Sequence, residues 1–115
     1  MDVETARQAA ERARGAIHAA EVLHARAPVI ARSCAKAVEG EVVVAVIEPE
    51  FGFGGAWTVP SDQLHERDAR LAQGGWSLTF SPHTPIDEIE GRALTMARQA
   101  FRRWEGLCRW AGRHR

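Results

Sequence analysis

Six consecutive apolar residues, Val42 to Ile47, constrain the fold of this chain more than any other feature. Five of the six are β-branched, and the run is apolar on both alternating faces, which is typical of a central strand covered on both sides. Spanning a bilayer takes about 20 apolar residues, so the run is too short for a membrane helix. We therefore predict a strand from Glu41 to Glu48 in the middle of a sheet.

Elsewhere along the chain, apolar residues recur at helical spacing in some segments and at every second position in others, which is typical of strands. Asp2 is a suitable cap for a first helix, and Pro28 suits the first turn of a second. Thr84 and Pro85 form the clearest helix start, with Thr84 as the cap. The expected elements are helices over 2–26 and 28–38, strands over 41–48 and 56–59, a helix over 61–72, a strand over 76–81 and a helix over 85–110.

This order predicts one α+β domain over residues 1–115, with a helical part over 1–40 and a sheet plus C-terminal helix over 41–115. The small sheet should have three mainly antiparallel strands packed by the long C-terminal helix, with the short helix carrying a crossover. The alanine-rich N-terminal helices would cover the other face of the central strand, or pair with a second copy of the chain.

The last helix is predicted to be amphipathic. One apolar stripe faces the body of the protein, and we expect Cys108 to be buried on it. Basic residues gather on the opposite face, with a second basic group and an indole beside them. The stripe comprises Ile86, Ile89, Ala93, Met96, Ala97, Ala100, Trp104, Leu107 and Cys108, widened by Phe101; the opposite face carries Arg98, Arg102, Arg109 and Arg113, and the group beside it Arg92, Arg103 and Trp110.

Charge is zero in sum but unevenly distributed. Residues 39–90 carry ten acidic residues against two Arg, whereas residues 92–115 carry seven Arg against one Glu. The arginine face of the last helix is therefore a candidate contact surface for an acidic protein or for phosphates. The alternative is a solvated face whose positive charge complements the helix dipole. Its basic residues would then be Arg rather than Lys because a GC-rich genome favours Arg codons.

The segment Phe51 to Trp57 contains three glycines after a strand, as phosphate-binding loops do. It lacks the spacing of a dinucleotide loop and the Gly-Lys-Ser/Thr of a nucleotide loop, and no helix start follows it. We interpret residues 51–55 as a mobile hairpin turn with Phe51 and Phe53 folded onto the core. The alternative is a recognition loop whose aromatic residues engage a partner.

Histidines and cysteines give weak signals for chemistry. The sequence His65-Glu66-Arg67-Asp68 begins like a zinc-protease helix, but Ala69 occupies the position of the second histidine. His24 should be a core histidine, and His83 is a candidate general base in a rigid loop. Arg32 and Lys36 would lower the pKa of Cys34, although core packing is its simpler role. We expect no metal, cofactor or catalytic residue.

These patterns predict a small, non-enzymatic, cytoplasmic binding or regulatory protein of bacterial or phage type, which masks or inhibits a macromolecular partner. The expected partner is a protein, with an acidic surface favoured and self-association into a homodimer also expected. The alternatives are a nucleic-acid-binding protein using the arginine helix and a small enzyme with a His/carboxylate site. The predicted partner-binding residues are Arg98, Arg102, Arg103, Arg109, Trp110, Phe51, Phe53 and Trp57.

Overall fold

A computed structural model describes residues 2–64 and 75–114 of the chain. It is an α+β fold in which a three-stranded antiparallel sheet packs against helices, as predicted. The expected helix over 61–72 begins as a 3₁₀ turn, and its remainder lies outside the described residues. The elements are α1 (Val3–Ala25), α2 (Ala27–Lys36), β1 (Glu41–Glu48), β2 (Gly52–Pro60), η1 (Ser61–Gln63), β3 (Trp76–Phe80) and α4 (Ile86–Arg113).

The sheet has the order β2-β1-β3, so the apolar run lies in the central strand as predicted. Val44 is the partner of Trp57 on β2 and of Thr79 on β3. Because β2 and β3 flank β1 on opposite sides, the connection between them must pass across β1. The strand order confirms a crossover between β2 and β3, and both neighbours of β1 are antiparallel to it, but most of the helix predicted to carry the crossover lies outside the described residues.

The glycine-rich segment is part of a strand, so the predicted turn over 51–55 is wrong. Strand β2 begins at Gly52, and Gly55 pairs with Val46. The register shifts between Val46 and Ile47, and Gly55 has a φ of 129°, a conformation that side-chain-bearing residues rarely adopt. Glycine therefore serves an irregular strand pairing here, a role that composition alone does not separate from a turn.

All three helices described lie on one face of the sheet, so the prediction that the N-terminal helices cover the other face is wrong. Leu23 of α1, Ile30 of α2 and Ile89 of α4 share one core with β1. The opposite face of β1 is also buried, with Val44 and Val46 packed against Trp57. The structure thus confirms that β1 is apolar on both faces because both are covered.

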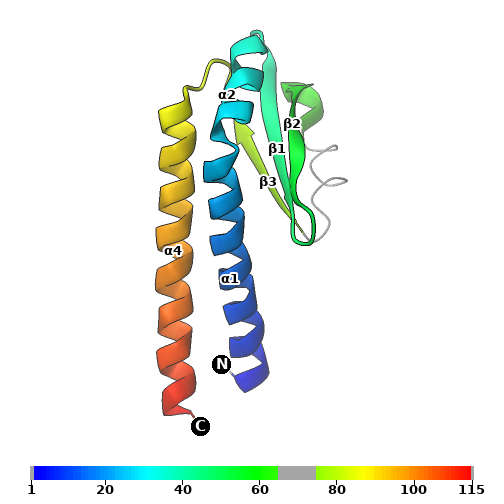
Figure 1. Cartoon of the computed structure of the whole chain (residues 1–115). Coiled ribbons are helices and arrows are strands. Elements are labelled where there is room, and N and C mark those ends of the chain that lie inside the picture. Colours follow the sequence, from blue (N-terminus) through cyan, green and yellow to red (C-terminus); the bar gives the residue numbers. More distant parts are fainter. Residues whose placement is uncertain (1, 65–74, 115) are drawn as a thin grey trace.

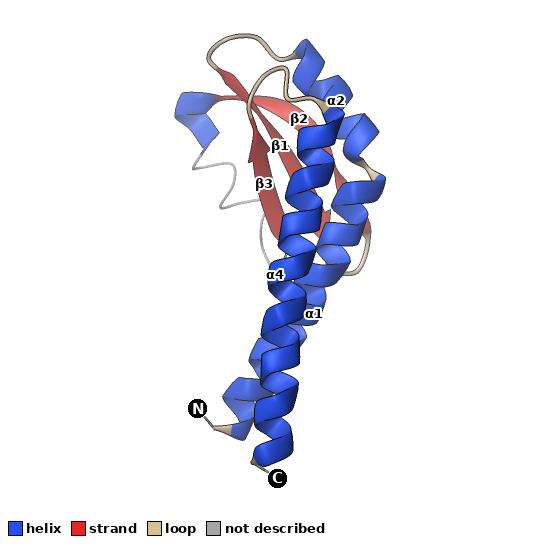
Figure 2. Cartoon of the chain, turned by 90° about the vertical axis from the view of Figure 1, so that its left-hand side faces the viewer, coloured by secondary structure: helices blue, strands red, loops and turns tan. Residues whose placement is uncertain are grey.

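Helices α1 and α4 are far apart in the sequence but pack as a long antiparallel pair, here called the helical hairpin. The pair extends beyond the sheet (Figures 1 and 2). Helix α4 has 28 residues, which corresponds to about 42 Å, whereas the eight residues of β1 span about 26 Å. The two ends of the chain lie close together at the far tip of the hairpin (Figure 1). Small buried residues on α1, among them Ala6 and Ala13, leave room for α4 to approach closely.

The helix starts follow the prediction at α1 and depart from it at α4. The Asp2 side chain accepts a hydrogen bond from the Thr5 backbone N–H at 2.7 Å, which confirms the cap. At α4 the cap position is Pro85, and Thr84 instead donates from Oγ1 to the Ser81 carbonyl at 2.6 Å. A hydroxyl that satisfies the preceding loop does not satisfy the helix, so the predicted Thr84 cap is wrong.

Candidate interaction surface on the helical hairpin

The predicted arginine face exists as one exposed line of side chains on an unbroken helix. Arg98, Arg102, Arg109 and Arg113, here called the arginine ridge, are all exposed on α4. Arg109 pairs with Glu105 on the next turn of the same helix. Within residues 2–64 and 75–114, Arg98 and Arg102 have no ion pair. The ridge is therefore open to solvent along most of its length.

The group predicted beside the ridge does not form one surface. The guanidinium of Arg92 donates to the Thr79 carbonyl and lies 4.3 Å from the ring centroid of Phe80, so this arginine fastens α4 to β3. Trp110 is half-buried in a hollow shared with α1, where its indole stacks on His114 at 4.1 Å between centroids. Arg103 is exposed at the edge of a separate hollow.

The single apolar stripe predicted on α4 is two stripes. An inner seam, which includes Ile89, Ala93 and Ala100, is buried. A second one is displaced around the helix and remains largely open, with Leu94 and Phe101 each 50% exposed. This outer seam comprises Leu94, Phe101 and Cys108, all exposed. The predicted burial of Cys108 is wrong, because it lies on the outer seam.

The outer seam faces away from the sheet. Leu78 of β3 lines a hollow with Arg92 and Gln99 of α4, which fixes the side of the helix that faces the sheet. Phe101 is two positions after Gln99, and a two-residue step is about 200° of helix rotation. Phe101 therefore projects to the side opposite β3, whereas Leu94 and Cys108 line hollows that α1 also lines.

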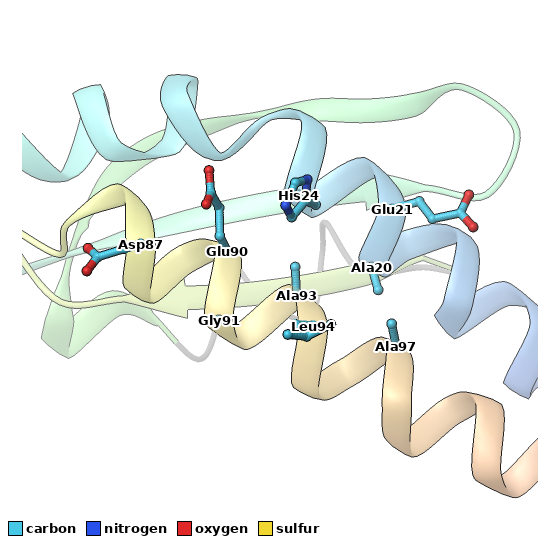
Figure 3. Close-up of a pocket in the computed structure, with 9 residues that line it drawn as sticks. All are labelled: Ala20, Glu21, His24, Asp87, Glu90, Gly91, Ala93, Leu94 and Ala97. Carbon is cyan, nitrogen blue, oxygen red and sulfur yellow. The ribbon is translucent and has the colours of Figure 1, made fainter.

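A hollow of about 560 Å³ lies between α1 and α4 near the start of α4 (Figure 3). Ala20 and Ala97 point toward one another across it, and Glu90 and His24 lie at its rim (Figure 3). His24 is exposed, so the prediction of a core histidine is wrong. Its side chain lies at the edge of the helix pair, because Leu23 takes the position that faces the core.

Glu21, His24, Asp87 and Glu90 line this hollow, but they are not placed together as a metal site. Among residues 2–64 and 75–114, no three His, Cys, Asp or Glu side chains are placed to hold a metal ion. His83 is exposed in the loop before α4 and has a φ of 61°. Its backbone N–H donates to the Cys34 carbonyl at 2.8 Å. The motif of His65 and Asp68 lies outside the described residues.

Cys34 is a core residue, fully buried between α2 and the sheet. Burial raises the pKa of its thiol and outweighs the hydrogen bonds with Thr84, which lower it. The expectation that Arg32 and Lys36 lower the pKa is therefore wrong. Both of those side chains are exposed on α2, where solvent screens them from the thiol.

The three aromatic residues of the segment 51–57 that were predicted to bind a partner do not lie on one surface. Phe51 is 80% exposed at the turn between β1 and β2, so the prediction that it folds onto the core is wrong. Phe53 packs against the helix-covered core, with the Arg26 guanidinium 5.8 Å from its ring centroid. Trp57 packs against Val44 and Val46 on the opposite face of the sheet. Only Phe51 is available as a free side chain.

No family model matches the chain, and it matches no curated protein and no solved structure. Over the described residues, none of the helices combines the length and apolar character that crossing a bilayer requires.

Proposed function

We propose that this protein is a non-enzymatic, cytoplasmic binding protein that masks or regulates another protein by docking its arginine ridge on an acidic surface. The observation that carries the proposal is the row of exposed guanidinium groups along one side of α4. Arg98 and Arg113 are 15 residues apart, so the ridge is about 22 Å long. That length suits contact with a neighbouring helix or sheet rather than with a small ligand.

The ridge keeps most of its positive potential because Glu105 pairs with Arg109 alone and the other acidic residues of α4 lie in its first turns. Glu90 precedes Arg98 by eight residues, which is about 12 Å along the helix. At physiological salt the Debye length is about 8 Å, so the first turns of α4 neutralise little of the ridge. An exposed patch of one sign mainly accelerates encounter with a complementary partner and orients it.

An acidic protein is favoured over a single-stranded nucleic acid because Trp110, the indole predicted beside the ridge, is not free. Trp110 was the residue suited to base stacking, but it is half-buried against α1 and stacked on His114. Binding to single strands combines a basic groove with aromatic platforms.

The test compares a 20-residue poly-glutamate peptide with a 20-nucleotide single-stranded RNA and a 20-base-pair DNA duplex, by fluorescence anisotropy at 50 and 200 mM salt. The ridge variant is Arg102→Gln, Arg109→Gln and Arg113→Gln together. The control variant is Arg7→Gln, Arg14→Gln and Arg32→Gln, which removes the same charge from exposed positions on α1 and α2.

We expect the ridge variant to lose about tenfold in affinity for poly-glutamate and the control variant less than about threefold. Equal losses of affinity in the two variants would show that binding depends on net charge alone and not on the ridge, and would overturn the proposal. Nucleic-acid binding that persists at 200 mM salt and disappears in the ridge variant would replace the protein partner with a nucleic acid.

A further inference from the structure

The hollow beside Arg103, here called the arginine hollow, is lined by two arginines from different helices. Arg12 belongs to α1 and Arg103 to α4, and the Gln99 side chain lies beside them. The volume is about 260 Å³, and the remaining lining is apolar, formed by Ala13, Ala16, Met96 and Ala100. None of the carboxylates among the described residues lines it, so the arginine hollow is purely basic.

The arginine hollow lies on the side of the helical hairpin that faces the sheet. Arg12 also lines a hollow with Trp76, and Gln99 also lines one with Leu78. Trp76 and Leu78 both belong to β3, so the sheet fixes which side this is. The arginine ridge points elsewhere, because the one-residue step from Arg102 to Arg103 is about 100° of helix rotation. The arginine hollow is therefore separate from the ridge.

Arg12 and Arg103 lie at nearly the same height along the helical hairpin. Ala20 and Ala97 point toward one another across it and mark a common level (Figure 3). Arg12 is eight residues before Ala20, about 12 Å along α1, and Arg103 is six residues after Ala97, about 9 Å along α4. Because the helices are antiparallel, both steps run toward the same tip. The two guanidinium groups can therefore reach one anion from opposite sides of the hollow.

Neither arginine of the hollow is neutralised within the described part of the chain. Arg12 and Arg103 take part in no ion pair there, and the side chain of Gln99 has no hydrogen-bond partner there. Glu11, the residue before Arg12, lines the hollow at Trp76 and not this one. Two positive charges that rigid helices hold close together repel one another. An anion between them would remove this repulsion, so the arrangement favours a negatively charged ligand.

We propose that Arg12, Gln99 and Arg103 bind the phosphate group of a phosphate monoester. Each guanidinium can donate two parallel N–H groups to phosphate oxygens, and the Gln99 amide adds a further donor. A phosphate monoester carries a charge of about −1.5 to −2 at pH 7, which matches two arginines better than the single charge of a carboxylate does. The arginine hollow has room for the phosphate and a few further atoms, and Met96 gives those atoms an apolar surface.

The first experiment titrates the full chain with phenyl phosphate and, separately, with benzoate, which has the same ring and a carboxylate in place of the phosphate. ¹⁵N nuclear magnetic resonance follows the side-chain amide of Gln99 and the Nε–H groups of Arg12 and Arg103. We expect phenyl phosphate to shift these resonances and to bind with a dissociation constant at least tenfold below that of benzoate. Equal affinity for the two ligands would overturn the proposal, because the hollow would then not select phosphate.

The second experiment repeats the phenyl phosphate titration on variants whose fold is checked by circular dichroism. Arg12→Gln and Arg103→Gln should each weaken binding at least tenfold, because each removes one charged pair of donors. Arg12→Lys keeps the charge without the planar fork and should still weaken binding about threefold. The matched controls, Arg14→Gln and Arg102→Gln, remove the same charge from exposed positions about 200° and 100° around the same helices and should weaken it less than about twofold.

A short peptide with one central phosphoserine separates the two sources of a phosphate monoester. Affinity at least tenfold above that of phenyl phosphate would support a phosphorylated protein as the source, and a lower affinity would support a small organic phosphate. No shift at about 20 mM phenyl phosphate would overturn the proposal, and so would control variants that lose as much affinity as Arg12→Gln and Arg103→Gln. The proposal is independent of the proposed function, because the ridge variant retains both arginines of the hollow and should lose less than about threefold.

Discussion

The indole of Trp76 lies directly against the backbone of α1 at Gly15. A Cβ atom built on Gly15 would come within 2.6 Å of the Trp76 Cη2 atom. Glycine in the middle of a helix costs about 1 kcal/mol relative to alanine. Because Gly15 has no side chain, the indole of Trp76, the first residue of β3, fills the space beside it. The glycine therefore weakens α1 locally but allows the sheet to pack closely against it.

The effect of Gly15→Ala on the free energy of unfolding should therefore depend on the residue at position 76, and should be opposite in sign with and without the indole. In the native chain, Gly15→Ala should lower the free energy of unfolding by about 1 kcal/mol, because overpacking costs about 1–3 kcal/mol and exceeds the gain in helix propensity. In a Trp76→Val background the same change should raise stability by about 0.5–1 kcal/mol. Urea denaturation of the four proteins measures the cycle; an additive result would contradict the contact.

Gly75 should tolerate no side chain, because the atom it would meet is backbone. A Cβ at this position would lie 2.5 Å from the carbonyl oxygen of Ile47. Gly75→Ala should lower the free energy of unfolding by about 2 kcal/mol, since a strand carbonyl cannot rotate away as a side chain does. Gly106→Ala is the control: its Cβ would meet nothing within 4 Å, and α4 should gain up to about 1 kcal/mol.

Cys34 should be chemically inert in the folded protein. Its side chain is fully buried, so a thiol reagent reaches it only when the chain opens. In a Cys108→Ser variant, which leaves Cys34 as the one remaining thiol, Ellman's reagent should react at the rate of unfolding. Immediate reaction in buffer without denaturant would show that the packing of α2 on the sheet is not as described.

The same thiol should make the protein less stable at alkaline pH. Burial raises the pKa of Cys34 in the folded state, so the folded chain keeps its proton where the unfolded chain loses it. The stability contribution is complete below the unfolded pKa of about 8.5 and falls as the pH rises above that value. Urea midpoints between pH 7 and pH 9.5 should fall less for Cys34→Ala than for native Cys34, both measured with Cys108→Ser.

The strands were the most predictable part of the fold, because their signals are local. The apolar run of β1 is bounded by turn residues and gives both its limits and its central position. Trp76 and Phe80 alternate with polar residues, and β3 coincides with that alternation. The start of β2 was missed because the irregular pairing at Val46 is made by two strands together and is invisible in either one.

The face of the sheet that the helices cover, and the division of the apolar surface of α4 into an inner and an outer seam, depend on contacts between distant parts of the chain. Local sequence patterns do not contain that information. Periodicity groups Ala93, Ala97 and Phe101 into one broad stripe, but a single helix, α1, covers only part of that width. Arg92 was assigned to an exposed group, yet its guanidinium is held by β3. The seven-residue spacing of Leu94, Phe101 and Cys108 was a signal that could have separated the two stripes.

The hairpin that extends beyond the sheet gives the molecule principal dimensions of 53 × 28 × 22 Å. A body of this shape tumbles more slowly end over end than about its long axis. Amide bonds in α1 and α4 point along that axis, whereas those of the strands run across it, so the two sets should give different ¹⁵N relaxation rates even in a rigid molecule. Nuclear magnetic resonance would then report the angle between hairpin and sheet without a single distance restraint.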